Sequence, residues 1–198
     1  METFFISDAH FFHDNVLKLD KRPFSSIEEM HTEMIKRWND RVTNKDIVYT
    51  LGDMCWLKAN DERYYDLLSQ LRGKKIVIRG NHTISSFPQK LISAGKIMKV
   101  CDIENIKFDG IRIQMCHYPM PFYKHNHAQN SWMFYGHLHM TDEYFAFEKF
   151  LQELRKDPDK YGSCRCVNVG VMLPYMNYEP KTFYEITEGY KNENRLFL

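Results

Sequence analysis

The chain has 198 residues, of which 43% are hydrophobic and 15% aromatic, which is enough apolar material for one domain, or for one domain with an insertion. Its 27 basic and 26 acidic residues nearly cancel, which argues against the clustered positive charge of a protein that binds nucleic acid over a broad surface. No apolar segment approaches the roughly 20 residues needed to span a bilayer, and the first residues lack the basic region of a signal peptide, so the sequence predicts a cytoplasmic protein with no membrane partner.

In the first half of the chain, strand and helix patterns alternate. Short apolar runs predict buried strands, and amphipathic stretches between them predict helices. The helix that starts at Ser25 and Ser26 has capping-box spacing to Glu28 and Glu29, and the next helix is expected to stop at Gly73. The predicted strands lie at 4–7, 47–51 and 76–79, and the predicted helices at 25–42, 61–71 and 88–94.

In the second half, strand patterns follow one another more closely. The dipeptide Asp109-Gly110 between two of them is a strong hairpin signal. A helix is expected at 143–156, and its inner face is expected to carry Phe147, Phe150, Leu151 and Leu154. The further strands are predicted at 97–100, 103–108, 111–116, 133–135, 166–171 and 182–187. Alternation at the front and hairpins at the back predict an α/β fold with two mixed sheets and helices outside.

The five cysteines indicate a reducing compartment, because their odd number and irregular spacing do not fit a disulfide framework. Cys164 and Cys166 form the one close pair, and two residues at i and i+2 of a strand face the same way, which rarely closes a good disulfide. Because no second pair is present to complete a zinc site, a packing role is favoured over thiol chemistry.

Residues that commonly bind metals follow five of the predicted strands. They are Asp8 and His10, Asp53, Asn81 and His82, His117, and His137 and His139. In open α/β sheets, ligands gather outside the carboxyl ends of the strands, so the pattern predicts a metal centre. Each residue alone has a simpler explanation: Asp8 could cap a helix, Asn81 could occupy a left-handed turn, and a lone His117 is more often structural. Their joint occurrence favours the metal centre.

The spacing of these residues suggests which of them would bind a metal and which would transfer a proton. Asp8 and His10 are two apart at a strand end, so both side chains can project to the same side. The Asp53 carboxylate can bridge two cations. His82 cannot easily reach the ion that Asn81 would hold, which leaves it free as a proton donor or a charge stabiliser. Nitrogen and oxygen ligands suit Mn, Fe, Zn, Co or Ni rather than a thiolate-bound soft metal.

Taken in order, the blocks Asp8-Ala9-His10, Gly52-Asp53, Gly80-Asn81-His82, His117 and Gly136-His137-Leu138-His139 resemble the signature of the calcineurin-like metallophosphoesterases, most of all their small bacterial and phage-type members. The blocks extend from residue 8 to residue 139. The resemblance implies a single metallophosphoesterase domain over residues 1–198. Its fold would be a four-layer sandwich of two mixed β-sheets flanked by helices, with the metal site at the carboxyl ends of the strands.

The resemblance also implies the roles of the residues. Two divalent cations are expected, with Mn as the first expectation. One would be held by Asp8, His10 and His139, and the other by Asn81, His117 and His137, with Asp53 bridging both. Asp53, Asn81 and His82 would be the catalytic residues, and His82 would face the scissile phosphate.

The implied activity is hydrolysis of phosphodiester or phosphomonoester bonds by a metal-activated bridging hydroxide. The partner would be a small phosphoester, with nucleotides among the candidates. The alternative is a catalytically weak or inactive scaffold that binds proteins on the same fold. The oligomeric state is not predicted.

The chain departs from the family pattern beside His82. The residue after it is Thr83, where many members have an acidic residue, and Trp56 stands where some relatives have an Asp that orients the catalytic histidine. His82 therefore lacks both of the carboxylates near it in sequence that would strengthen it as a general acid.

The loop at 8–24 is expected to lie over the metals. Within it, His13, Asn15 and Arg22 are candidate substrate-binding residues, because a histidine or arginine there could grip a phosphate oxygen. Ordinary loop polarity is the alternative for all three. His125 and His127, in the loop between two ligand strands, are expected to be solvated.

Overall fold

The computed structural model describes residues 1–58, 61–83, 87 and 89–194. Its strands are β1 (Thr3–Ile6), β2 (Ile47–Thr50), β3 (Lys74–Ile78), β4 (Ile97–Cys101), β5 (Ile103–Phe108), β6 (Ile111–Cys116), β7 (Ser131–Tyr135), β8 (Cys166–Asn168) and β9 (Lys181–Thr182). Its helices are α1 (Val16–Leu19), α2 (Ile27–Arg41), α3 (Glu62–Gln70), α4 (Gln89–Ser93), α5 (Asp142–Arg155), α6 (Pro158–Tyr161) and α7 (Phe183–Asn194). Pro88, the first residue of the helix expected at 88–94, lies outside the described residues.

The strands form two mixed sheets, as predicted. The first has the order β4-β3-β2-β1-β9, in which β1 to β4 are parallel and β9 is antiparallel to β1. The second has the order β5-β6-β7-β8. In it, β5 and β6 form the antiparallel hairpin expected at Asp109-Gly110, and β6, β7 and β8 are parallel. The parallel strands of each sheet deliver their carboxyl ends to one edge.

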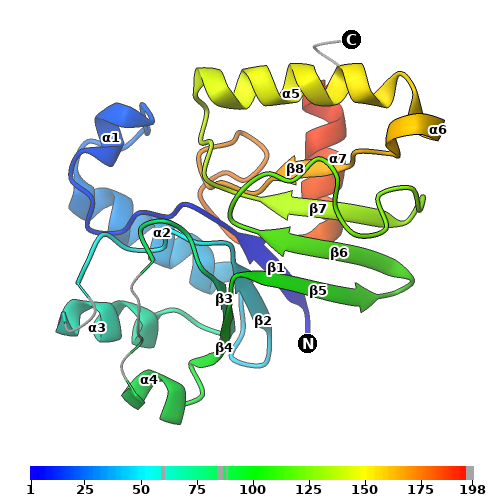
Figure 1. Ribbon diagram of the computed structural model, residues 1–198. Helices are drawn as coiled ribbons and strands as arrows, with labels where there is room; N and C mark the ends of the chain where they lie inside the picture. Colours follow the sequence, from blue (N-terminus) through cyan, green and yellow to red (C-terminus); the bar gives the residue numbers. More distant parts are fainter. Residues whose placement is uncertain (59–60, 84–86, 88, 195–198) are drawn as a thin grey trace.

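The two sheets pack face to face between helices. Figure 1 shows α1 to α4 on one side of the molecule and α5 to α7 on the other. Phe5 of β1 meets Phe134 of β7 edge to face, with 5.0 Å between the ring centroids. The next residue of β7, Tyr135, points the other way and packs against Phe147 of α5, as the alternation of side chains along a strand requires. These contacts build the four layers that the sequence predicted.

Helix α2 begins with a capping box, as its spacing predicted. Ser26 is the N-cap, and its hydroxyl accepts a hydrogen bond from the backbone N–H of Glu29. The Glu29 carboxylate accepts in return from the backbone N–H of Ser25. The capping pair satisfies N–H groups that the first helical turn cannot pair internally.

The prediction of a closing strand at 182–187 is wrong. Strand β9 ends at Thr182, and α7 continues from Phe183. A capping box explains the change: Thr182 Oγ1 accepts from the N–H of Glu185, and the Glu185 carboxylate accepts from the N–H of Thr182. Phe183, Ile186 and Tyr190 are buried, and this spacing of three and four residues belongs to one face of a helix.

The expected inner face of the helix at 143–156 is also corrected. Phe150 is 45% exposed, while Tyr144 and Glu148 are buried. The Glu148 carboxylate accepts hydrogen bonds from the hydroxyls of Tyr135 and Tyr190, and these partners let a charged residue occupy the inner face. Two short helices, α1 and α6, were not predicted.

All five cysteines are free thiols, and Cys164 and Cys166 are buried, which fits the packing role expected of that pair. Among the described residues, no helix combines the length and the apolar character that crossing a membrane would require.

Candidate metal centre

The loops that follow β1 and β2 run side by side beyond the sheet. The N–H of His10 donates to the carbonyl of Asp53 at 2.9 Å, that of Phe11 to Met54 at 2.9 Å, and that of Trp56 back to Phe11 at 2.8 Å. This backbone pairing extends the parallel β1–β2 ladder past its last residues. It fixes His10 and Asp53 beside each other.

The carboxyl ends of the two sheets meet at Ser7. Its N–H donates to the carbonyl of Val169 at 2.9 Å, and its carbonyl accepts from the N–H of Val171 at 3.0 Å, which forms a parallel bridge between Ser7 and Gly170. The Ser7 hydroxyl also donates to the carbonyl of Leu51 at 2.7 Å. The residues after β1, β2 and β3 therefore face the residues after β6 and β7.

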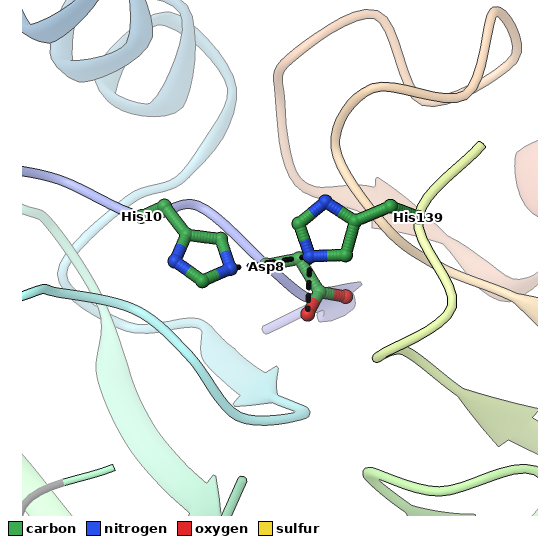
Figure 2. A group of neighbouring side chains, drawn as sticks. All are labelled: Asp8, His10 and His139. Atoms are coloured by element: carbon green, nitrogen blue, oxygen red, sulfur yellow. Dashed lines mark hydrogen bonds and ion pairs between the residues drawn. The ribbon is translucent and has the colours of Figure 1, made fainter. Parts of the chain in front are cut away.

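Three of the predicted ligands converge in the first cluster, Asp8, His10 and His139 (Figure 2). The Nε2 atoms of His10 and His139 are 3.2 Å apart, and His139 Nε2 lies 3.6 Å from Asp8 Oδ1. One candidate ligand atom from each residue lies within 4.8 Å of the others. Asp8 and His10 are buried.

The second cluster contains Asp53, Asn81, His117 and His137. His117 Nε2 lies 2.9 Å from Asn81 Oδ1 and 3.4 Å from Asp53 Oδ2. His137 Nδ1 lies 3.0 Å from the same oxygen of Asn81. Because ligand atoms of Asp8, Asp53 and His117 also lie within 4.8 Å of one another, the two clusters adjoin.

The hydrogen bonds of two histidines leave lone pairs that point into the clusters. His117 Nδ1 donates to the carbonyl of Leu51 at 2.7 Å, and His139 Nδ1 donates to the carboxylate of Asp20 at 2.7 Å. In the neutral rings Nε2 is then an acceptor. Each Nε2 nevertheless faces other acceptors: the Asn81 and Asp53 oxygens for His117, and an Asp8 oxygen for His139. Acceptors that converge in this way fit divalent cations.

The electrostatics of the site favour bound positive charge. Burial lowers the pKa of His10 to about 3, so this imidazole is neutral and ready to ligate. Burial by itself would raise the pKa of Asp53, but the adjacent His117 ring and the hydrogen bond from the N–H of His82 bring that pKa below its usual value. Burial likewise opposes protonation of His117, yet Asp53 and Asp8 raise the pKa of its ring. The buried carboxylates therefore attract cations.

Five of the predicted ligands have left-handed backbone conformations. The φ angles are 56° for Asp8, 51° for His10, 49° for Asp53, 71° for His137 and 51° for His139. Such conformations cost a non-glycine residue on the order of 1 kcal/mol or more, and they gather at functional sites. They occur at both residues of the Asp8/His10 pair and of the His137/His139 pair. Asn81 is not among the residues with a positive φ, so it does not occupy the left-handed turn considered as its alternative.

The glycines of the motif make room for the ligands. A Cβ on Gly136 would overlap Asp8 and Ser7, and a Cβ on Gly80 would overlap Asp53 Oδ1 and lie 2.9 Å from His117 Cε1. Neither glycine has a positive φ. The requirement at both positions is therefore one of space.

Gly80→Ala is expected to disrupt the centre, because the new methyl group would push Asp53 away from His117. We expect a loss of metal affinity of at least ~10-fold, the lower bound for a disturbed metal partner, measured by competition with a chelator. Gly95→Ala is the matched control: nothing lies within 4 Å of its Cβ, but its φ is 66°, so it should lower the melting temperature and leave metal affinity unchanged. Equal metal affinity in the two variants would contradict this explanation.

Asp20 is a component of the site that sequence reasoning missed. It orients His139, and it is itself held by Arg22, whose Nε and Nη2 donate to the Asp20 carboxylate at 2.9 and 2.7 Å. The same guanidinium donates to the carbonyls of Ala9 and Asp8 at 2.7 and 2.9 Å. No local pattern links residue 20 to residue 139.

The expectation that Arg22 contacts substrate is corrected by these bonds. Its side chain is fully buried, and the carbonyls and the carboxylate occupy its donors. Arg22 instead supports the loop that carries Asp8 and His10. We expect it to act on the metal centre through Asp20.

Asp20→Asn is expected to weaken metal binding by about 10- to 100-fold, the effect of losing a partner behind a metal ligand. The amide can hold the ring of His139 less firmly and contributes no charge. Chelator competition measures the loss. Asp14→Asn, an exposed change in the same loop, is the control, and equal affinities in the two variants would refute the role of Asp20.

His82 lies at the exposed side of the second cluster. Its N–H donates to Asp53 Oδ1 at 2.9 Å, and its ring contacts Trp56, with 4.3 Å between centroids. Thr83, the residue that departs from the family pattern, accepts from the N–H groups of Gly80 and Asp53 through its hydroxyl. It thereby closes the turn that presents Asn81 and His82.

The remaining candidates lie at different distances from the centre. His13 is near it: its ring is 5.4 Å from that of His10 and stacks on Trp56. Asn15 is exposed at the start of α1 and makes no side-chain cap. His125 and His127 are exposed, which agrees with their expected solvation.

The chain is similar to a protein family, to a protein of known sequence and to a protein of known structure. The family model described as calcineurin-like phosphoesterase matches residues 1–162. An uncharacterized protein of Methanocaldococcus jannaschii, MJ1445, is 34% identical over 179 residues, which make up 89% of this chain and 84% of that protein. The crystal structure of a protein of unknown function from Aquifex aeolicus, AQ665, has a TM-score of 0.64 with 23% identity, covering 94% of this chain and 97% of that one. This last likeness concerns the fold alone.

Proposed function

The chain belongs to the calcineurin-like phosphoesterase family, and from that premise we propose that it is a metal-dependent phosphohydrolase with two divalent cations between the ends of its sheets. The observation that carries the proposal is the convergence of acceptors: His139 Nε2 faces Asp8, and His117 Nε2 faces Asn81 and Asp53. Acceptors so arranged, most of them buried, repel one another unless a cation lies between them.

Each cation has its own set of ligands in the proposal. Asp8, His10 and His139 hold the first, and Asn81, His117 and His137 hold the second. Asp53 serves both, since its carboxylate belongs to the second cluster and also lies within 4.8 Å of a ligand atom of Asp8 in the first. Two bound cations would supply a nucleophile by lowering the pKa of water, and they would neutralise charge that develops on the phosphoryl oxygens.

The other steps belong to the chain's own residues. Asp53 keeps His82 near the reacting phosphate, because the backbone N–H of His82 is bonded to its carboxylate. The His82 ring is exposed and next to the second cluster, where it is placed to protonate or hydrogen-bond the oxygen of the leaving group. Asp20 and Arg22 hold the His139 ring in the orientation that ligation needs.

The substrate in this proposal is a small phosphodiester or phosphomonoester. No capping domain covers the centre within the described part of the chain, and an open dinuclear site accommodates both ester types. Manganese is the proposed metal, and the donor set also suits Fe, Zn, Ni and Co. A single domain in the cytoplasm, with its cysteines reduced, completes the proposal.

Hydrolysis of bis-p-nitrophenyl phosphate beside p-nitrophenyl phosphate tests the proposal. Metal-stripped protein should be inactive, and addition of Mn, Ni, Zn or Mg should show which ion restores turnover. The ratio of the two rates gives the preference for diester or monoester. Two bound metal ions without turnover of either ester, or of a panel of nucleotides, would instead support a scaffold that binds proteins.

A further inference from the structure

A pocket of about 400 Å³ lies beside His82. It is lined by Trp56, Leu57, Lys58, Asp61, Arg63 and His82. Its volume falls within the roughly 300–1,000 Å³ of sites that bind small organic molecules. His82 belongs both to this pocket and to the surroundings of Asp53, so the pocket begins where the proposed metal centre ends.

Trp56 forms an aromatic wall of this pocket. The indole stacks on the ring of His13, with 4.3 Å between centroids and 11° between planes, and the ring of His82 lies 4.3 Å from it at an angle of 51°. The backbone bond from Trp56 to Phe11 fixes the position of the residue. Trp56 is nevertheless 45% exposed. A rigid ring is therefore held beside the exposed His82 with much of its surface free for a ligand.

The charge of the pocket is positive. Asp61 accepts from Arg63 through both of its carboxylate oxygens, the shortest contact being 2.6 Å, and the Arg63 guanidinium lies 5.3 Å from the ring of Phe12. The charges of Asp61 and Arg63 therefore cancel within the pocket. Lys58 is exposed, and no carboxylate of the described residues forms an ion pair with it. One cation is thus left to attract an anionic group.

We propose that this pocket binds the leaving group of the phosphoester, and that this group is a planar aromatic ring that carries an anion, as in a mononucleotide. The inference rests on the proposed function, because it places the scissile phosphate at the metal centre. His82 would meet the leaving oxygen, Trp56 would stack on the ring, and Lys58 would face the anionic group. Stacking on an aromatic side chain accepts any base, so the proposal specifies the class of substrate and not one base.

The test uses the manganese-loaded protein and four probes that separate the parts of the ligand. AMP has both the ring and the anion, adenosine lacks the anion, ribose 5-phosphate lacks the ring, and inorganic phosphate probes the metal centre alone. Binding is followed directly by isothermal titration calorimetry in the parent protein and in every variant, and by tryptophan fluorescence in the parent protein. Trp38 is buried and Trp132 is half-buried, so a change that disappears in Trp56→Phe is assigned to Trp56. Inhibition of bis-p-nitrophenyl phosphate hydrolysis gives a second readout.

We expect AMP to bind more tightly than either adenosine or ribose 5-phosphate. Trp56→Ala should weaken AMP and adenosine by roughly 10-fold, the scale of base stacking on an aromatic side chain, while Trp56→Phe retains most of the affinity. Lys58→Ala should weaken AMP and leave adenosine unchanged. Neither variant should alter the affinity for inorganic phosphate. Phe145→Ala removes an equally exposed aromatic ring on α5 and is the matched control.

Two results would overturn the inference. One is equal binding of AMP and ribose 5-phosphate with no effect of Trp56→Ala. The other is an equal loss of inorganic phosphate affinity in Trp56→Ala, which would mean that the ring supports the metal centre instead of binding a ligand. Because calorimetry needs neither turnover nor Trp56, a protein that binds AMP through Trp56 without hydrolysing any ester would separate failure of the proposed function from failure of this inference.

Discussion

Asp53→Asn is expected to lose metal from both sites and to lose turnover with it. Asp53 is 2% exposed, and it is the proposed bridging ligand. An amide keeps the shape of the carboxylate but removes the negative charge and one acceptor. We expect the metal affinity to fall at least ~10²-fold at both sites. Losing a residue that only supports a metal ligand costs up to about 100-fold, and the loss of a ligand itself should cost no less. Metal content after gel filtration and the rate with bis-p-nitrophenyl phosphate measure the two losses.

Asp46→Asn is the matched control for this substitution. Asp46 is 5% exposed and lies just before β2, at the end of the strand opposite Asp53. Its carboxylate accepts from the N–H groups of Glu2 and Thr43 at 2.7 and 2.8 Å. The control should lose stability and keep both metal ions. If Asp53→Asn instead retained two ions and a normal rate, the bridging assignment would be wrong.

His82→Ala is expected to keep both metal ions and to lower kcat by about 10²- to 10⁴-fold, the usual contribution of a positioned acid. The alanine retains the backbone N–H that bonds Asp53, so the ligands should stay in place. The loss should grow as the leaving group becomes more basic. Comparing p-nitrophenyl phosphate with phenyl phosphate measures this dependence, since phenolate needs a proton more than p-nitrophenolate does.

His127→Ala is the control for this variant, because His127 is exposed in the loop before β7. It should match the parent protein with both esters. An equal decrease of kcat for both leaving groups in His82→Ala would mean that His82 stabilises the phosphoryl charge and is not the acid. Loss of metal from His82→Ala would mean that His82 takes part in metal binding.

The sequence was informative wherever a local pattern determines the structure. An apolar run followed by Gly-Asp or Gly-Asn-His predicts both a strand and the residue at its end, and β2 and β3 carry Asp53 and Asn81 as expected. The two-sheet sandwich follows from the same runs. Contacts between distant residues have no such pattern. Asp20 and His139 are joined by a hydrogen bond across 119 residues, so the support of the first cluster was not predictable.

The helix α7 shows a different failure. The run from Thr182 to Thr187 is short and apolar, and such runs fit a strand or a buried helix equally well. The capping signal, Thr182 followed three residues later by Glu185, was present in the sequence. Its hydrogen bonds decide in favour of the helix. The same spacing at Ser26 and Glu29 correctly predicts the start of α2.

Because five of the predicted ligands have a left-handed backbone conformation, stability and activity favour different residues at these positions. The left-handed φ angles at Asp8, His10, Asp53, His137 and His139 strain the backbone. Glycine at any of these positions would relieve the strain, so a lineage with no use for the metals would gain stability by drifting towards glycine. All five positions instead have a carboxylate or an imidazole, which costs the fold stability and which a metal-binding centre would require.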